Sequence, residues 1–290
     1  MERIRQALEQ ANIDREKAGV ERRSPVAPPA VTPGQSAPQH PLAGRQTEQA
    51  PKVSASEVVY TETRSVDVSR QTMLDNRLVA AIDGHKLQDN FRILRTQIMK
   101  EMRDNNWNMI AVTSPHSGAG KSTTAINLAI ALAMDISHTV MLVDADLREP
   151  SIHKYFGYEP EYGLSDHLQH GTDIKDVLFH PPIDRLCVLP GREGVANSAE
   201  LLGSPQAAKL AEELKTRYDD RLVVLDLPPI LSSDDVSMSD TYIDCVLMVT
   251  ETGVTKRREL TEAFRVLKNI PVIGTVLNKV PRQKNVFKRS

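Results

Sequence analysis

The chain has 290 residues, of which 40% are hydrophobic and 4% aromatic, and its 36 basic residues nearly balance its 38 acidic ones. The formal net charge of -2 excludes a protein whose overall field draws it to nucleic acid or anionic lipid. Length and apolar content together predict one sizeable core with a flexible extension. Cys187 and Cys245 each lie in an apolar run, which predicts buried thiols in a reducing compartment and no disulfide framework.

Residues 1–20 place Ile4, Ala7, Leu8 and Ala11 at helical spacing, which predicts a short amphipathic helix. This helix is either a fraying end or a segment that docks on another protein. Charges stand where a secretory signal needs an apolar core, so we expect a cytoplasmic protein. No stretch approaches the roughly 20 consecutive apolar residues that cross a bilayer, so any attachment to the inner face of the plasma membrane is expected to be peripheral and to need a partner.

The segment 21–75 is rich in Pro, Ala, Gln and Ser, which predicts a disordered, partly extended linker. A folded domain is expected over 76–282, with a helix around 83–103 near its start, and a short tail without tyrosine follows at 283–290. Six strand-like runs alternate with helical segments: 109–113, 139–143, 185–189, 221–225, 244–249 and 272–277. This alternation predicts an α/β fold, a mostly parallel sheet flanked by helices on both faces, with a disordered N-terminal extension. Ligands of such sheets bind beyond the carboxyl ends of the strands.

A glycine-rich loop follows the first strand-like run and precedes an apolar helical segment. The order strand, glycine loop, helix is typical of a P-loop, whose backbone N–H groups close on phosphate oxygens at a helix N-terminus. Lys121 is expected to span the outer phosphates of ATP, and the Ser122 hydroxyl to ligate Mg²⁺. Pro115 stands where the strict pattern has its first glycine, and a flexible loop with a chance lysine is the alternative. The expected nucleotide-binding residues are Ser117, Gly118, Ala119, Gly120, Lys121, Ser122 and Thr123.

Carboxylates end two of the other runs. Asp144, Asp146 and Arg148 follow the second run, and Asp226 follows the fourth. Buried carboxylates need a counter-charge, which Lys121 and Mg²⁺ would supply. A solvated turn is the alternative for the acidic pair after the second run. We predict catalytic roles for Lys121, Asp144, Asp146 and Arg148, and metal ligation by Ser122, Asp144 and Asp226.

Asn278 follows the last run, at a position where an amide beside the nucleotide can contact the edge of a base. Guanine-binding motifs of the Asn-Lys-x-Asp kind carry an aspartate three residues after the asparagine, where this chain has Pro281. Asn278 is therefore predicted to contact adenine. An ordinary polar strand end is the alternative.

Three stretches carry a family resemblance. Segment 144–150, Asp-Ala-Asp-Leu-Arg-Glu-Pro, resembles a second Walker motif called A-prime, and 226–229, Asp-Leu-Pro-Pro, resembles a Walker B motif of Asp-Thr-Pro-Pro. Segment 197–204, Asn-Ser-Ala-Glu-Leu-Leu-Gly-Ser, resembles a stretch typical of the same group. Over residues 78–280 the chain thus resembles the bacterial tyrosine kinases of polysaccharide export, relatives of the ParA and MinD ATPases. His116 stands where those ATPases carry a signature lysine, which favours the kinase branch.

The resemblance implies partners. Asp89, Arg92 and Arg95 match the spacing of a Glu-x-x-Arg-x-x-Arg segment through which family members assemble into rings, with aspartate replacing glutamate. On spacing alone, a solvated helix face is an equally good interpretation. The family also implies a membrane polysaccharide co-polymerase of the Wzz type, whose cytoplasmic segment activates the ATPase, and the helix at 1–20 is the candidate adaptor.

The chain departs from the family at the expected phosphoryl acceptor. Family kinases usually end in a tyrosine cluster, whereas here no tyrosine follows Tyr242, and Tyr60 is the one expected to be freely presented. Leu227 also replaces the usual Walker B hydroxyl residue. We predict a tyrosine kinase of exopolysaccharide synthesis that uses ATP and Mg²⁺; the alternatives are a MinD-like ATPase switch and a module that only senses nucleotide. Nucleic-acid binding is not expected, because no basic stripe or recognition helix accompanies the P-loop.

Overall fold

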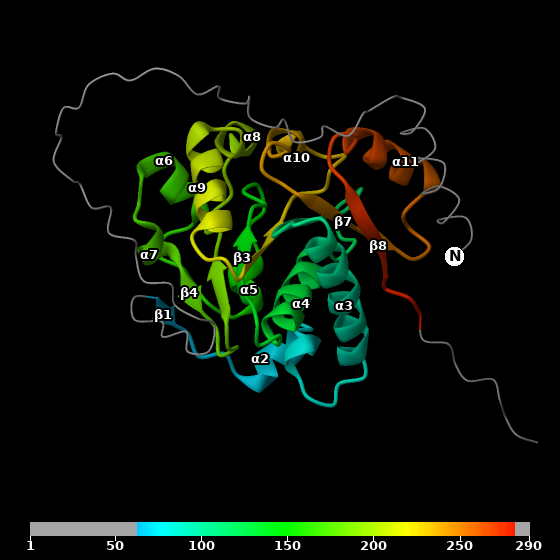
Figure 1. Cartoon of the computed structure of the whole chain (residues 1–290), viewed down its shortest axis with the longest axis horizontal. Coiled ribbons are helices and arrows are strands. Elements are labelled where there is room, and N and C mark those ends of the chain that lie inside the picture. The colour runs from blue at the N-terminus through cyan, green and yellow to red at the C-terminus, as the bar shows by residue number, and fades with distance from the viewer. Residues whose placement is uncertain (1–62, 282–290) are drawn as a thin grey trace, which may run out of the picture. The chain divides into compact units, whose positions relative to one another are not determined.

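The computed structural model describes residues 63–281 of the chain (Figure 1). The predicted helix at 1–20, the predicted tail at 283–290 and Tyr60 lie outside the described residues. The strands are β1 (Arg64–Ser65), β2 (Met109–Thr113), β3 (Thr139–Asp144), β4 (Phe179–His180), β5 (Leu186–Leu189), β6 (Arg221–Asp226), β7 (Cys245–Glu251) and β8 (Val272–Asn278). The helices are α2 (Arg70–Asp75), α3 (Gln88–Asp104), α4 (Lys121–Ala133), α5 (Ile152–Tyr155), α6 (Leu164–His170), α7 (Ile174–Val177), α8 (Ser198–Leu202), α9 (Pro205–Thr216), α10 (Asp235–Met238) and α11 (Arg257–Val266), with a 3-10 turn η1 at Val79–Ala81.

The strands of the described region form one sheet in the order β1-β4-β5-β3-β6-β2-β7-β8. Every neighbouring pair is parallel except β4 and β5. The six predicted runs correspond to β2, β3, β5, β6, β7 and β8, so the predicted fold class is confirmed. The two-residue strands β1 and β4 were not predicted, because so short a stretch shows no hydrophobic period.

Each face of the sheet has its own apolar core, because successive residues of a strand point to opposite faces. On β2, Ile110 and Val112 belong to the cluster that α3 and α4 cover. Met109 and Ala111 belong to the cluster that α8, α9 and α11 cover. Figure 1 shows α3 and α4 side by side, with α8, α9 and α11 elsewhere around the sheet. Helices therefore cover both faces, as predicted.

Helix α4, which begins at the P-loop lysine, is buried along its whole length from Thr124 to Ala133. The buried amide of Asn127 donates to the carbonyl of Arg77 (2.9 Å) and accepts from the N–H of Ala80 (2.8 Å). These bonds lock the helix against the turn η1. The helix that carries the phosphate loop is thus held on all sides by the core.

Two predicted boundaries differ from the structure. The segment 63–75, which we predicted as linker, is folded: Val68 and Met73 are buried, and β1 pairs with β4. Its few apolar residues are separated by polar ones, so the sequence carries no period there. The helix predicted around 83–103 begins at Gln88, because Gly84 has a φ of 76°, which interrupts helical geometry.

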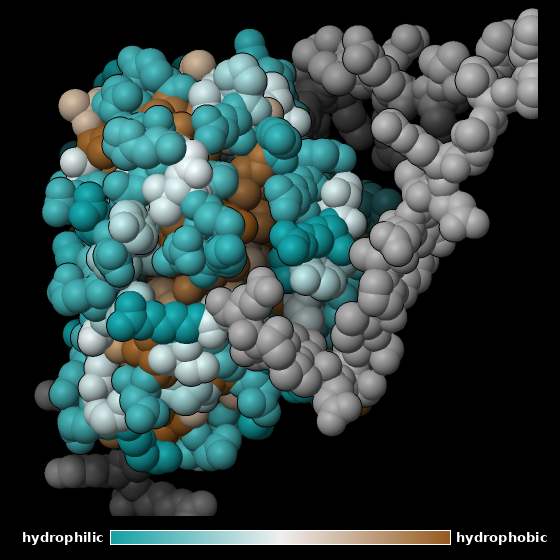
Figure 2. Space-filling model, turned by 90° about the vertical axis from the view of Figure 1, so that its left-hand side faces the viewer, coloured by the Kyte–Doolittle hydropathy of each residue, from teal (hydrophilic) through white to brown (hydrophobic). Residues whose placement is uncertain are grey.

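No helix between residues 63 and 281 combines the length and the apolar content that a bilayer span requires. Cys187 and Cys245 are buried and free, as predicted. Burial raises the pKa of the Cys187 thiol to about 11, so the thiol stays protonated at neutral pH. Figure 2 shows the face on the left of Figure 1, where hydrophobic residues form narrow strips between hydrophilic ones.

Candidate nucleotide-binding and phosphoryl-transfer site

The P-loop leaves the carboxyl end of β2 and turns into α4. Gly118 and Gly120 adopt φ values of 80° and 93°, the left-handed region that favours glycine. The Thr113 hydroxyl donates to the carbonyl of Pro228 at 2.7 Å, and the Ser114 hydroxyl donates to the carbonyl of His116 at 2.8 Å. The start of the loop is therefore tied to the segment that follows β6.

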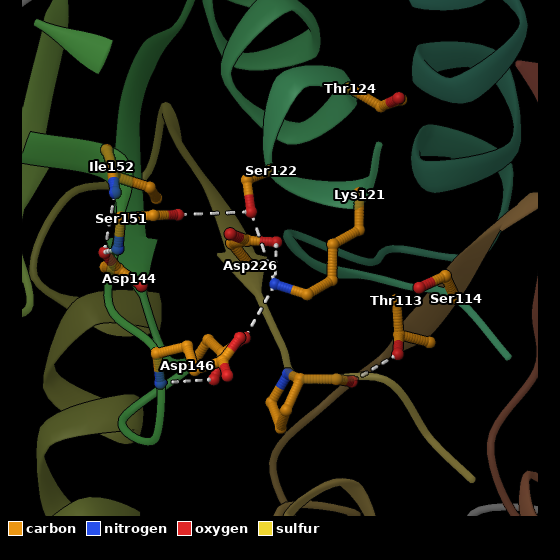
Figure 3. Close-up of polar contacts among 12 residues, drawn as sticks. Thr113, Ser114, Lys121, Ser122, Thr124, Asp144, Asp146, Ser151, Ile152 and Asp226 are labelled. Carbon is orange, nitrogen blue, oxygen red and sulfur yellow. Dashed lines mark hydrogen bonds and ion pairs between the residues drawn. The ribbon is translucent and has the colours of Figure 1, made fainter. Parts of the chain in front are cut away.

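Lys121 points into a group of carboxylates (Figure 3). Its Nζ lies 2.7 Å from Oδ2 of Asp146 and 3.6 Å from Oδ1 of Asp226, and it donates to the Ser122 hydroxyl at 3.2 Å. Burial alone would lower the pKa of the Lys121 amine, but the charges of Asp226 and Asp146 outweigh burial and raise the pKa. The amine is thus permanently charged at the point where phosphate oxygens would enter.

Asp144 and Asp226 are directly paired residues of the neighbouring strands β3 and β6, and both are fully buried. Burial, with the charge of Asp226 added, raises the pKa of Asp144 to about 7. Burial also raises the pKa of Asp226, although the charge of Lys121 opposes this shift. Two neighbouring carboxylates that are both buried away from water favour a cation between them.

The carboxylates also shape the loop after β3. Oδ2 of Asp144 accepts from the N–H groups of Ser151 (2.8 Å) and Ile152 (2.9 Å), and Oδ1 of Asp146 accepts from the N–H of Glu149 (3.1 Å). The loop therefore folds back over the strand end. This brings the Ser151 hydroxyl to 3.5 Å from that of Ser122.

The donor set at this strand edge fits Mg²⁺. Among the described residues, Oδ1 of Asp144 and Oδ2 of Asp226 are buried without a hydrogen-bond partner. Oδ1 of Asp226 faces the Lys121 amine at 3.6 Å, and the hydroxyl of Ser122 lies close to these oxygens. Between residues 63 and 281 no cluster of three or more His, Cys, Asp or Glu side chains forms a metal cage. Mg²⁺ is normally bound by one or two carboxylates together with substrate phosphates, so hard oxygen ligands without a full cage suit this ion.

Arg148 does not lie with the P-loop side chains. It is half exposed and donates through Nε (3.3 Å) and Nη2 (3.2 Å) to Oδ1 of Asp235 in α10, with Asp234 at 3.8 Å. Asp235 is fully buried, so this ion pair holds the loop after β3 against α10. The structure thus assembles Lys121, Asp144 and Asp146 but turns Arg148 to another partner.

Asn278 reaches the P-loop, although in a way that the sequence did not suggest. Its Nδ2 donates to the carbonyl of Ala119 at 2.9 Å. The predicted contact between Asn278 and adenine stays a prediction, while the contact between its amide and the loop backbone is present in the structure. At the other end of the loop, the Thr123 hydroxyl lies 3.1 Å from that of Tyr155.

Several contributors were not predicted. The N–H groups of Ser151 and Ile152 belong to the backbone, so no side-chain pattern marks them. Gly191 follows β5, and a Cβ atom there would collide with Pro150 and lie 3.4 Å from Cγ of Asp144. The rule that sites lie beyond strand ends points to this loop. Glycine has no side chain, so no pattern of reactive residues marks this position.

The three predicted assembly residues on α3 have different environments in the structure. Asp89 and Arg92 are exposed and pair with each other at 3.3 Å. Arg95 instead donates to the carbonyl of Ala131 in α4 at 3.2 Å, so it is used within the chain. Leu227, the departure in the Walker B motif, is fully buried in the core.

Comparisons with known proteins agree with this geometry. A family model for the CobQ/CobB/MinD/ParA nucleotide binding domain matches residues 110–289. The putative tyrosine-protein kinase EpsB of Ralstonia nicotianae is 33% identical over 225 residues, covering 73% of this chain and 29% of that protein. Tyrosine-protein kinase YwqD of Bacillus subtilis is 30% identical over 213 residues, covering 72% of this chain and 89% of that protein. The crystal structure of the chimerical protein CapA2B2 is 27% identical with a TM-score of 0.66, covering 76% of this chain and 94% of that chain.

The chain spans less than a third of the length of the EpsB relative but most of the length of YwqD. The region matched by the family model, residues 110–289, contains the P-loop, both acidic strand ends and the loop after β3. By the family model and by these relatives, the chain belongs to the CobQ/CobB/MinD/ParA nucleotide-binding domain family and, within it, to the bacterial tyrosine kinases.

Proposed function

We propose that this chain binds Mg·ATP at the P-loop and transfers the γ-phosphoryl group to a tyrosine, in the synthesis or export of an exopolysaccharide. The observation that carries the proposal is the position of Lys121, whose Nζ lies between Asp146 and Asp226 at the N-terminus of α4. Kinase names among its relatives support the choice of tyrosine as acceptor.

Each residue of the site has a role that follows from its chemistry. The backbone N–H groups from Ser117 to Thr123 would surround the phosphates, and the Lys121 amine would neutralise charge on the transferring group. Ser122, Asp144 and Asp226 would hold Mg²⁺, which when bound neutralises phosphate charge and orients the outer oxygens.

Asp146 is the better candidate for the residue that orients or deprotonates the acceptor hydroxyl. It lies 2.7 Å from the amine that would face the γ-phosphate, whereas Asp144 is fixed by two backbone N–H groups. A general base must lie within hydrogen-bond reach of the proton that it takes, and Asp146 is the nearer group to that point.

The acceptor has room to approach beside the loop after β3. A hollow of about 420 Å³ is lined by Arg148, Glu149, Pro150, Ser151, Lys154 and Gly194. Ser151 links this hollow to Ser122, the proposed metal ligand. We place the acceptor tyrosine here, next to the Ser151 hydroxyl.

A second candidate function is a MinD-like ATPase switch that regulates a membrane co-polymerase without modifying tyrosine. The observation that favours it is that the family model matching residues 110–289 includes MinD. The two candidates share the nucleotide site and differ only in the acceptor, which is tyrosine in one and water in the other.

The partners and the location of the chain are also proposals. We place it in the cytoplasm, at the inner face of the plasma membrane, bound to the cytoplasmic segment of a Wzz-type co-polymerase. Exposed Asp89 and Arg92 on α3 would contribute to a homo-oligomer, with Arg95 supporting α3 from inside. No nucleic-acid partner is proposed.

The purified chain should be incubated with γ-labelled ATP and Mg²⁺, with and without the co-polymerase segment. We expect label on tyrosine, and we expect Lys121→Met to lower it by about 100-fold or more, because one lost charge-stabilising donor costs about that factor. Label found only as free phosphate would favour the ATPase switch. Binding of ATP with no turnover at all would leave only a nucleotide-sensing module.

A further inference from the structure

The amide of Asn278 is bound on both sides. Its Nδ2 donates to the carbonyl of Ala119 at 2.9 Å, and its Oδ1 accepts from the N–H of Lys279 at 2.8 Å. A flipped amide would set oxygen against oxygen and N–H against N–H at these two contacts. The orientation of the amide is therefore determined by its partners, and a donor must face Ala119.

The residue that carries this amide is itself held firmly. Asn278 ends β8 and pairs with Glu251 of β7, and its carbonyl accepts from the N–H (3.1 Å) and the hydroxyl (3.0 Å) of Thr252. Lys279 adds an ion pair to Glu251 at 3.0 Å. Asn278 thus connects a fixed strand end to the P-loop.

The contact with Ala119 determines how one peptide group of the P-loop is turned. The carbonyl of Ala119 and the N–H of Gly120 belong to the same planar trans peptide, so they point in opposite directions. A donor that holds the carbonyl from outside the loop turns the N–H of Gly120 towards its inside. P-loops bind phosphate oxygens through such inward N–H groups.

Glycine at position 120 is required by the same contact. A Cβ atom there would collide with Nδ2 of Asn278, and the φ of 93° also favours glycine. The amide therefore packs directly against the backbone of the loop. The side chain of Asn278 therefore supports the conformation of the loop by packing as well as by hydrogen bonding.

We propose that Asn278 is a positioning residue of the P-loop, which contributes to phosphate affinity by holding the Ala119–Gly120 peptide and does not select the base. This inference rests on nucleotide binding at the P-loop and does not depend on tyrosine as the acceptor. It differs from the adenine contact that the sequence predicts for the same residue.

The test is binding of ATP, GTP and inorganic tripolyphosphate, which has no base, measured by calorimetry with Mg²⁺. Asn278→Leu removes the donor without adding a charge. We expect it to weaken the binding of ATP and of tripolyphosphate by the same factor, about ten-fold for one lost hydrogen bond. The ratio of ATP to GTP affinity should stay unchanged. Asn269→Leu, the same substitution at an exposed asparagine before β8, should change none of these affinities.

If Asn278→Leu does not fold, Asn278→Ala removes the amide without adding volume and carries the same test. Weaker ATP binding with unchanged tripolyphosphate binding, or loss of the preference between ATP and GTP, would assign Asn278 to the base and overturn the inference. Unchanged affinity for all three ligands overturns it as well. A wild-type chain that binds neither ATP nor tripolyphosphate removes the proposed nucleotide function itself.

Discussion

Charge balance at the site depends on single residues. Lys121 and its carboxylates are buried together, so the lysine charge is compensated before any nucleotide enters. The negative charge of Asp144 is less well compensated. Burial and the charge of Asp226 therefore raise its pKa to about 7. The site is thus least stable when Asp144 and Asp226 are both ionised. A divalent cation would relieve the repulsion between these two carboxylates.

The raised pKa of Asp144 predicts a pH dependence of stability. A carboxyl group whose pKa is higher in the folded chain stabilises the fold fully below its unfolded pKa, and this contribution is lost as pH rises through the folded pKa. For Asp144 the window runs from about 3.8 to about 7. Without nucleotide and with a chelator present, the wild-type Tm should fall across this window relative to that of Asp144→Asn.

The measurement is thermal unfolding of both proteins at several pH values in one buffer series. The difference between the two Tm values should grow steadily from pH 4 to pH 7 and then level off. Two parallel curves would show that Asp144 keeps the same pKa in the folded and unfolded chain. Its burial beside Asp226 would then have no effect on protonation.

At the scale of elements, the loop after β5 supports the loop after β3. Gly191 touches Pro150 and approaches Asp144, while the N–H of Val195 donates to the carbonyl of Leu147 at 2.8 Å. Gly191 does not adopt a left-handed φ, so a larger residue is excluded there by contact alone. The carboxylate of Asp144 is therefore held by backbone on one side and by a neighbouring loop on the other.

Gly191→Ala should move this pair of loops. Overpacking of a close contact costs about 1–3 kcal/mol, and each kcal/mol lowers Tm by about 2–4 °C in a domain of this size. We expect a lower Tm together with reduced ATP turnover, because Pro150 and Asp144 must shift. Gly274→Ala is the control, since its Cβ would meet only Leu247 at 3.9 Å. A Gly191→Ala chain with wild-type Tm and turnover would show that the loops do not support each other.

At the scale of the whole molecule, α3 is the element through which we expect copies of the chain to meet. The structure leaves Asp89 and Arg92 exposed in its first two turns, with 76% and 49% of their side chains accessible. Exposed pairs within one helix contribute little to stability, so both residues are available to a neighbouring copy. Arg95 donates to the carbonyl of Ala131, so we expect it to stabilise the fold of the chain and not the contact between copies.

Arg92→Glu should therefore reduce assembly without unfolding the chain. We expect smaller species in sedimentation velocity with Mg·ATP, at concentrations where the wild type assembles, because like charges would then face each other across the contact. Lys100→Glu reverses a charge at another exposed position of α3 and serves as the control. Equal loss of assembly in both variants would point to net charge and not to this contact.

The sequence by itself determined the fold class, the P-loop and the acidic strand ends. Each of these follows from order along the chain: a strand, a glycine loop and a lysine-led helix are consecutive, and the carboxyl ends of parallel strands meet at one edge. Lys121, Asp146 and Asp226 therefore come together as their positions suggested. Family membership rests on the same local motifs and was confirmed by the comparisons.

Only the tertiary structure decided which partners the long and flexible polar side chains take. Arg148 binds Asp235, Arg95 binds the carbonyl of Ala131, and Asn278 binds that of Ala119. Each partner lies far away in the sequence, on an element brought close only by packing. Spacing along a helix or strand determines the face on which a side chain lies, but it holds no information on which groups will stand opposite that face.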